Sequence, residues 1–210
     1  EDWEGAYDFR ARLIDLLRGD NRFDELILQA RLCTTPIQDP YRAIDAYSEA
    51  RKLRSSDPIV LRALGKLYRE TSQHLRAVEA LHELSGALTE PAERRDVSLE
   101  IASIHSEELH EPLKAVEALG AALDLDPGCL DAFARIEQIL AAGKHWTLLE
   151  ENYRKMIERL PKGASHNARA VLWRSLGDLY LKVLKNEDGA LMSYEVVLKL
   201  KPDEKEVSMQ

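Results

Sequence analysis

Histidines and acids in the segment HSEELH, His105 to His110, are the first residues of this chain that could do chemistry. A zinc-binding helix of the zincin type needs two histidines four positions apart, on one face, with a glutamate between them. His105 and His110 are five positions apart, with Glu108 between them, and this spacing directs the two rings to different sides of a helix. We therefore predict ordinary helix residues near a turn here, and no metal site.

The rest of the sequence offers no catalytic constellation. Its other histidines lie near expected helix ends and form no cluster: His74, His82, His145 and His166. The sequence contains no GxSxG nucleophile motif, phosphate-binding glycine loop or dinucleotide-binding glycine pattern. Adjacent acids such as Glu150 and Glu151 are common on solvated helical faces. The sequence thus predicts a protein that is not an enzyme and holds no cofactor or metal.

A repeated segment organises the chain instead. The stretch Leu99–Pro127 recurs on both sides in altered form, at offsets of 72 and 75 residues. The alignment superimposes two sets of residues: Ala43, Ala115 and Ala190, and Tyr47, Leu119 and Tyr194. Because each offset is about twice 36, a further repeat is expected between each pair, and segments beginning at Gly65 and Glu137 fit it. A period of about 34 residues with helical patterning predicts an array of helix–turn–helix repeats.

The residues in register resemble the motif of the tetratricopeptide repeat (TPR) family. That motif has a bulky residue, Leu-Gly and Tyr on one helix, then small, aromatic and small residues followed by Pro on the next. Three repeats carry it as Leu61, Leu64, Gly65, Tyr68, Ala77 and Leu81; as Phe133, Ile136, Leu140, Leu149, Tyr153 and Met156; and as Trp173, Leu176, Gly177, Tyr180, Ala190, Tyr194 and Pro202. Gly65, Ala102 and Gly177 are expected where paired helices cross most closely, since a large side chain would separate them.

The resemblance covers nearly the whole chain and implies an all-α fold, an α-solenoid of antiparallel helix pairs. We expect about five TPR-type repeats in a right-handed superhelix, forming a single solenoid over residues 1–210. The expected repeats span about 22–57, 58–91, 92–127, 128–161 and 162–202. Each helix pair cannot bury its apolar stripe alone, so stacking between neighbours should provide the stability.

Residues 1–18 are expected to be the second helix of an incomplete preceding repeat. The reason is that Trp3 aligns with Trp146 and Ile14 with Ile157, in a segment expected to be a second helix. Residues preceding Glu1 in a longer protein would then supply the partner helix. An alternative pairs 10–18 with 23–33 as one hairpin.

Helix boundaries follow from capping residues. The expected helices span about 4–18, 22–34, 40–54, 58–71, 74–87, 91–108, 112–125, 129–142, 145–160, 165–184 and 188–201. Asp39-Pro40, Asp57-Pro58 and Asp126-Pro127 each combine an N-cap acceptor with proline at the first helical position, and Ser165 is a further expected N-cap. The first, third and fifth repeats carry one extra residue between their helices, before Ala43, Ala115 and Ala190. The array should therefore alternate two repeat types.

Composition narrows the choice of partners. The net charge is −8 and there is no basic stripe, so nucleic acid is a poor partner. No apolar run approaches the roughly 20 residues of a membrane span, and no signal peptide is visible. Cys33 and Cys129 lie about three repeats apart, which predicts free thiols and fits a reducing compartment. We expect a cytoplasmic protein.

The TPR resemblance also indicates a binding surface, because the first helices of TPR repeats line the concave face. In this sequence the corresponding groove residues are Arg62, Lys66, Arg69, Leu99, Ser103, Gln138, Arg174 and Asp178. The surface is basic at the second repeat and neutral or mixed beyond it, which favours a peptide with acidic residues at one end. The alternative is that this polar face is unoccupied and the true contacts lie elsewhere.

Some TPR proteins clamp the terminal carboxylate of chaperones with Lys, Asn and Arg. The matching positions here hold Arg62, Lys66, Glu100, Asp131 and Arg135, and two acids would repel a carboxylate. We therefore expect a non-catalytic scaffold for another protein or peptide. The alternatives are an assembly segment of a larger protein that associates through its solenoid ends, including a homo-oligomer through the C-terminal helix, and a regulatory module of a catalytic domain outside residues 1–210.

Overall fold

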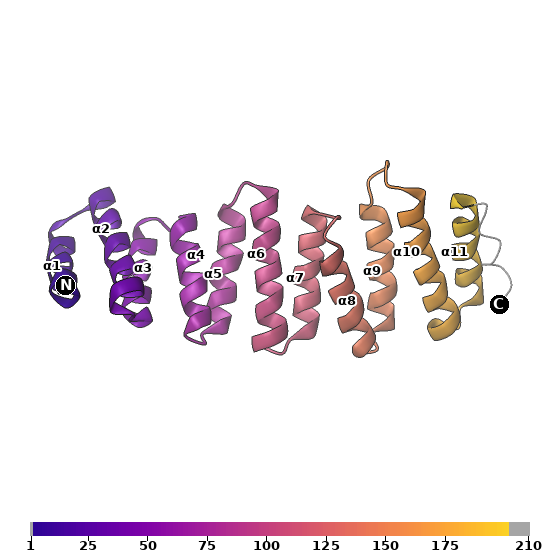
Figure 1. Ribbon diagram of the computed structural model, residues 1–210, viewed down its shortest axis with the longest axis horizontal. Coiled ribbons are helices and arrows are strands. Elements are labelled where there is room, and N and C mark those ends of the chain that lie inside the picture. Colours follow the sequence, from indigo (N-terminus) through magenta and orange to yellow (C-terminus); the bar gives the residue numbers. More distant parts are fainter. Residues whose placement is uncertain (1, 202–210) are drawn as a thin grey trace. The chain divides into compact units, whose positions relative to one another are not determined.

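The computed structural model describes residues 2–201, and this part of the chain forms eleven α-helices and no β-strand (Figure 1). The expected all-α fold of paired helices is confirmed. The chain divides into two compact units, Glu1–His110 and Glu111–Gln210. Pro202, which was expected to follow the last helix, lies outside the described residues. A single continuous solenoid with the five repeat boundaries given above stays a prediction.

The first unit contains six α-helices, each packed against its neighbours in the chain. They are α1 (Trp3–Leu16), α2 (Gly19–Leu32), α3 (Pro40–Leu53), α4 (Pro58–Glu70), α5 (His74–Ala87) and α6 (Pro91–Ser103). Two short π-helical turns extend α2 and α6: η1 (Cys33–Ile37) and η2 (Ile104–Glu108). In the predicted repeats, α2 and α4 are the first helices of successive repeats, and α3 and α5 are their second helices.

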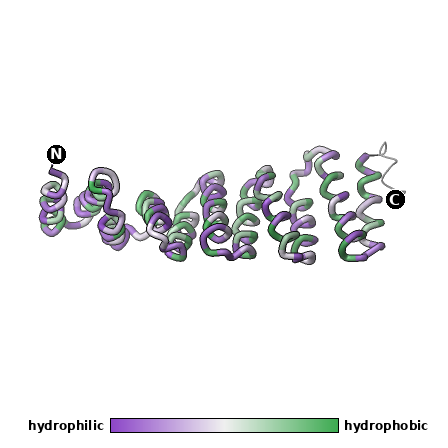
Figure 2. The backbone as a smooth tube through the Cα atoms, turned by 60° about the horizontal axis from the view of Figure 1, so that its bottom comes forward, coloured by the Kyte–Doolittle hydropathy of each residue, from purple (hydrophilic) through white to green (hydrophobic). Residues whose placement is uncertain are grey.

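The second unit contains five α-helices, again packed in chain order. They are α7 (Pro112–Leu125), α8 (Leu130–Ala142), α9 (Trp146–Arg159), α10 (His166–Leu179) and α11 (Glu187–Leu200), with the π-helical turn η3 (Tyr180–Leu184) extending α10. Figure 2 shows hydrophobic residues along the described helices with hydrophilic residues between them, the pattern of helices that bury one face. In the predicted repeats of this unit, α8 and α10 are first helices and α9 and α11 are second helices.

Glycines lie where paired helices approach most closely, as the sequence predicted. A Cβ atom on Gly65 of α4 would lie 3.1 Å from Cδ2 of Leu81 of α5. A Cβ atom on Gly177 of α10 would lie 2.7 Å from Cε1 of Tyr194 of α11, closer than carbon atoms pack. The bulky residue of the second helix therefore occupies the space that the glycine leaves on the first.

Three of the four expected N-caps are confirmed. Asp39 accepts hydrogen bonds from the N–H groups of Tyr41 and Arg42, Asp57 from those of Ile59 and Val60, and Ser165 from that of Ala168. The expected Asp126-Pro127 cap is wrong. Asp126 Oδ1 accepts instead from the Gly128 N–H at 2.9 Å, and α8 begins later, at Leu130. The Asp126 side chain thus closes an Asx turn, in which it binds the N–H group two residues later, instead of capping the helix.

The extra residue of alternate repeats lies in the π-helical turns. In the second and fourth repeats a residue with left-handed backbone, Ser72 or Lys144, follows the first helix. The N–H group of the next residue donates to a carbonyl five residues earlier. These bonds run from Gln73 to Tyr68 at 2.7 Å and from His145 to Leu140 at 2.8 Å. In the first and fifth repeats the corresponding bonds reach back six residues, from Asp39 to Cys33 and from Asn186 to Tyr180, both at 2.9 Å. The insertion therefore widens the last helical turn and does not lengthen the loop.

Candidate functional site

The first unit presents a surface, here called the first-helix face, that centres on α4. Two hollows flank it. One of about 640 Å³ is lined by Pro58, Ile59, Arg62, Ala63, Lys66, Leu88, Glu93 and Glu100. The other, of about 470 Å³, is lined by Thr34, Thr35, Gln38, Pro40, Tyr47, Ala63, Lys66, Leu67 and Glu70. Ala63 and Lys66 line both hollows, so Lys66 stands between them.

The two predicted basic residues of this face have little internal use. Arg62 is exposed and has no hydrogen bond or ion pair among the described residues. The side chain of Lys66 is 77% exposed, and its Nζ lies 3.7 Å from Glu70 Oε1, one helical turn away. Such an exposed pair contributes little to stability, about 0–1 kcal/mol. Both cations are therefore available to a ligand.

Arg69, the third predicted basic residue, is already bound within the unit. Its guanidinium donates to Glu108 Oε1 at 2.7 and 2.9 Å and to Ser103 Oγ at 2.9 Å. These bonds join α4 to α6 and η2, and they bring together two predicted groove residues, Arg69 and Ser103. The other oxygen of Glu108, Oε2, is buried without a partner among the described residues. Arg69 and Ser103 thus brace the first-helix face, and Leu99 lies half-buried on the same helix as Ser103.

The predicted groove residues of the second unit differ in their surroundings. Asp178 accepts a hydrogen bond from the Tyr194 hydroxyl at 2.6 Å and pairs with Lys182 at 3.0 Å. Gln138 and Arg174 are exposed, on α8 and α10. The structure places these three residues in one unit and Arg62, Lys66, Arg69, Leu99 and Ser103 in the other.

The Tyr194–Asp178 contact changes the acidity of both groups. Burial, and then the bond to Asp178, raise the pKa of Tyr194 to about 12. Burial alone would raise the pKa of Asp178, but the hydrogen bonds from Tyr194 and Lys182 and the charge of Lys182 outweigh it and lower this pKa. The fourth repeat has a related contact, one position earlier on the first helix, in which Tyr153 donates to Glu137. Burial and that carboxylate raise the pKa of Tyr153.

This comparison explains why Lys66 stays free. Lys66 occupies the position of Asp178, directly after the glycine at the helix crossing, whereas Glu137 occupies the position of that glycine. The second helix carries Leu81 where the fifth repeat has Tyr194, so the second helix offers Lys66 no hydroxyl from that position. The polar residue at this position is therefore satisfied internally in the fifth repeat but left to solvent or ligand in the second.

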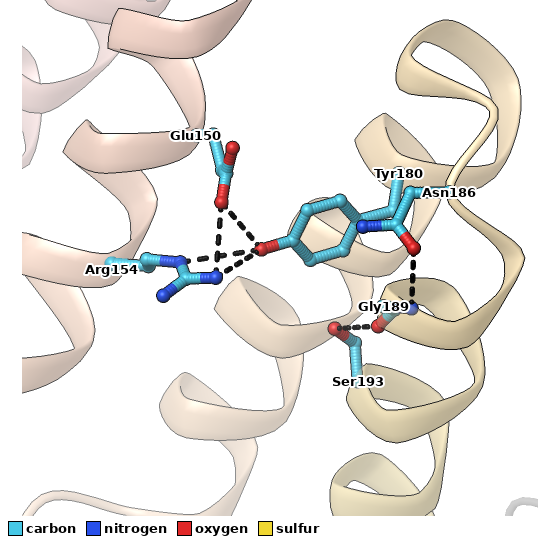
Figure 3. Close-up of polar contacts among 6 residues, drawn as sticks. All are labelled: Glu150, Arg154, Tyr180, Asn186, Gly189 and Ser193. Carbon is cyan, nitrogen blue, oxygen red and sulfur yellow. Dashed lines mark hydrogen bonds and ion pairs between the residues drawn. The ribbon is translucent and has the colours of Figure 1, made fainter.

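A second polar cluster, which the sequence analysis did not predict, lies between α9, η3 and α11 (Figure 3). The Tyr180 hydroxyl donates to Glu150 Oε1 at 2.7 Å and accepts from Arg154 Nη2 at 2.7 Å, and Arg154 pairs with Glu150 at 3.0 Å. Burial, and then the bond to Glu150, raise the pKa of Tyr180. The cluster borders an apolar hollow of about 330 Å³ that Trp173 and Met192 help to line. The three side chains bind one another, and these bonds join α9 to η3.

The described residues offer no metal centre. No group of three His, Cys, Asp or Glu side chains in residues 2–201 could hold a metal ion. Cys33 and Cys129 are free thiols, and burial raises the pKa of Cys33 to about 11, which disfavours its reactive thiolate form. In the same part of the chain no helix combines the length and hydropathy required to cross a bilayer.

Comparison with known proteins identifies the fold. No protein-family model matches the sequence, and no curated protein matches it either. Among solved structures, a TPR repeats protein of Bacteroides fragilis, BF2334, is similar over 88% of this chain and 94% of its own, with a TM-score of 0.56 and 12% identity. YrrB, described as a TPR protein with an unusual peptide-binding site, covers 86% and 87% with a TM-score of 0.45 and 19% identity. MamA from Desulfovibrio magneticus RS-1 covers 90% and 99%, with a TM-score of 0.48 and 14% identity.

The BF2334 likeness, together with the motif residues at the helix crossings, shows that this chain has the TPR fold. At 12% identity the likeness concerns the fold alone. The binding properties of the chain must be argued from its own residues.

Proposed function

We propose that this protein is a non-catalytic scaffold that binds a peptide segment of a partner protein on the first-helix face of its first unit. The observation that carries the proposal is the unpaired Arg62 beside Lys66 on α4. One hollow of about 470 Å³ and another of about 640 Å³ flank this helix. Exposed cations without internal partners, placed over concave surface, favour recognition of a charged segment. Arg69 and Ser103 support the face from beneath, and Leu99 lies beside them on α6.

The charges around α4 define the partner more narrowly. Glu70, Glu93 and Glu100 also line the two hollows and would repel an acidic chain along most of its length. A suitable peptide therefore carries an Asp or Glu that reaches Arg62 and Lys66, and neutral residues on both sides. In the second unit, Gln138, Arg174 and Asp178 stay predicted contacts.

An array of dodecapeptides tests this proposal, with Asp and Asn exchanged at one position in otherwise identical pairs. We expect the chain to prefer the Asp member of some pairs. The double variant Arg62→Glu/Lys66→Glu should bind those peptides at least tenfold more weakly, because two attractions become repulsions. The charge-matched control Arg12→Glu/Lys52→Glu should bind like the wild type. Unchanged affinity of the Arg62/Lys66 variant, with unchanged circular dichroism, would contradict the proposal.

A second candidate function is assembly through exposed apolar residues of α1 and α11. Leu191 and Met192 of α11 are 60% and 68% exposed, and Phe9 and Leu16 of α1 are 68% and 81% exposed. Hydrophobic residues also follow much of α11 in Figure 2. Clustered apolar side chains on a surface favour contact with another protein or a second copy of the chain.

A further inference from the structure

The second unit contains a groove that the proposed function does not use. It runs between α7 and α9 over α8, has a volume of about 410 Å³, and is here called the α7–α9 groove. Ile136 of α8, which is 1% exposed, lies at its floor, and Gly120 and Ala121 of α7 form part of one wall. Leu148 lies on the other wall and is 41% exposed.

Two buried polar groups in this groove have no partner within the described residues. Asn152 is 8% exposed, and its Nδ2 is buried without a hydrogen bond. Arg159 donates from Nε to Asp124 at 2.7 Å and from Nη2 to the Gly120 carbonyl at 3.2 Å, but its Nη1 is buried and unpaired. Leaving such a group unsatisfied costs about 1–3 kcal/mol. Native proteins keep few of them, so a pair lining one groove points to a missing partner.

Asn152 is also an exception in the repeat pattern. It precedes Tyr153 on α9, and the residues that precede the corresponding positions in the other repeats are small: Ala46, Ala80, Ala118 and Ser193. Ser193 satisfies its hydroxyl on its own helix, by donating to the Gly189 carbonyl at 2.8 Å (Figure 3). The fold therefore needs only a small residue at this place, and the amide of Asn152 brings hydrogen-bonding capacity that packing does not require.

The chemistry of the groove selects its occupant. Both unpaired atoms are donors, so the occupant must present acceptors. A helical peptide has used most of its carbonyls internally, whereas an extended peptide offers one on each edge about every 6.6 Å. Asn152 and Arg159 are seven residues apart on α9, roughly 10.5 Å along the axis and on one face. Side chains of their different lengths can therefore reach two carbonyls on the same edge of an extended peptide.

Charge and size limit the occupant further. Glu117, Asp124 and Glu151 line the groove against Lys155 and Arg159, which leaves one net negative charge and disfavours an anion. Gly120 and Ala121 let a peptide backbone approach closely, and Leu148 offers an apolar contact. A second copy of this chain, with a net charge of −8, is a poor electrostatic match.

We propose that the α7–α9 groove binds an extended, apolar peptide segment of another protein. This segment has no acidic residues, and its backbone carbonyls accept hydrogen bonds from Asn152 and Arg159. This is a second site, on different helices from the first-helix face. Binding would satisfy both orphaned donors at once, whereas the free protein bears the cost of leaving them unpaired.

The test uses dodecapeptides selected from a phage-displayed random library on the immobilised full chain, resynthesised with fluorescein and measured by anisotropy. We expect a class of peptides without Asp or Glu whose Kd rises at least tenfold with Asn152→Ala and with Ala121→Arg, which fills the groove. The matched variant Ser193→Ala should leave that Kd unchanged. Asn152→Ala should also raise the Tm of the free protein by about 2–4 °C, because it removes a buried unsatisfied group.

The outcomes separate this site from the first-helix face. Peptides that respond to Arg62→Glu/Lys66→Glu but not to Asn152→Ala would support the proposed function and overturn the second site. A raised Tm with unchanged binding of every selected peptide would show that Asn152 is an unsatisfied interior residue that contacts no ligand, and would also overturn the second site. The same holds if the library yields no peptide, or if Asn152 is needed only for a dimer of the chain.

Discussion

Two glycines at equivalent helix crossings should respond differently to the same substitution. In Gly177→Ala the new methyl group meets a ring carbon of Tyr194 at 2.7 Å, and the bond from Tyr194 to Asp178 holds that ring in place. We expect a loss of about 1–3 kcal/mol in the free energy of unfolding. In Gly65→Ala the methyl group meets the flexible end of Leu81 at 3.1 Å, and the better helix propensity of alanine offsets about 1 kcal/mol.

Denaturant unfolding of both variants measures the difference, with Lys182→Ala as an exposed control that should change stability by less than about 0.5 kcal/mol. Equal losses from Gly177→Ala and Gly65→Ala would show that the tyrosine ring does not fill the space beside Gly177.

The bond between Tyr194 and Asp178 predicts how stability depends on pH. The folded state raises the pKa of Tyr194 to about 12 from about 10, so its contribution is complete below pH 10 and is lost as the pH rises towards 12. The pKa of Asp178 is lowered, so its contribution is lost as the pH falls below about 4. Tyr194→Phe should therefore cost about 1 kcal/mol between pH 6 and 9, and progressively less outside that range.

Chemical denaturation at a series of pH values follows this difference, with Tyr41→Phe, at a side chain that is 63% exposed, as the control. A cost of Tyr194→Phe that stays constant from pH 9 to pH 12 would contradict the assignment.

The π-helical turn η3 absorbs one residue that two other repeats lack, and this predicts which deletions the chain tolerates. Deleting Val183 shortens the path from Tyr180 to the left-handed Lys185 to the length found between Tyr68 and Ser72. The helix then ends as in the second repeat. We expect this variant to fold and to unfold cooperatively, at a cost below about 3 kcal/mol.

Deleting Ser175 is the matched control. This deletion rotates the two parts of α10 on either side of position 175 by about 100° relative to each other. Either Gly177 or the residues before the deletion therefore leave their packing positions. We expect loss of cooperative unfolding and of helical circular dichroism. Equal tolerance of both deletions would show that η3 is not the place where the extra residue is accommodated.

At the element scale the sequence predicted more than it did at the site. Regular spacing of Ala, Gly and Tyr defined the helices, because close packing permits few residue types at each crossing. The extra residue of alternate repeats was counted correctly, but its π-helical form depends on the hydrogen bond from Asn186 to Tyr180, and residue types do not specify that bond. Likewise Asp126 could cap a helix or close a turn, and only the local backbone decides between the two.

Functional surfaces of the whole molecule depend on contacts distant in sequence, which explains what the motif could not predict. Arg69 resembles Arg62 in the sequence, yet Glu108, 39 residues away, binds it and leaves Arg62 as the available cation. The unsatisfied donors of Asn152 and Arg159 are apparent only once α7 and α8 surround them. A departure from the small residues that other repeats carry at the position of Asn152 was the one sequence signal for that groove.

The exposed apolar side chains of α11 lead us to expect self-association of the chain. If Leu191 and Met192 of α11 form a contact, the wild-type chain should sediment as a concentration-dependent dimer or larger species, because this surface is apolar and exposed. The variant Leu191→Glu/Met192→Glu should remain monomeric, since each substitution places a charge in the contact. A wild-type chain that is monomeric at high micromolar concentration would contradict this assembly.

Zero-length cross-linking tests the central claim most directly. A carbodiimide joins a carboxylate to an amine only when the two are in contact, so an acidic peptide seated on α4 should couple to Lys66. Using the tightest Asp-containing peptide of the array, we expect mass spectrometry to identify Lys66 as the main coupled residue. Arg62→Glu should reduce the yield, and the Asn form of the peptide should not couple. Coupling mainly to lysines outside α4, such as Lys155 or Lys182, or at equal yield to many lysines, would contradict binding on the first-helix face.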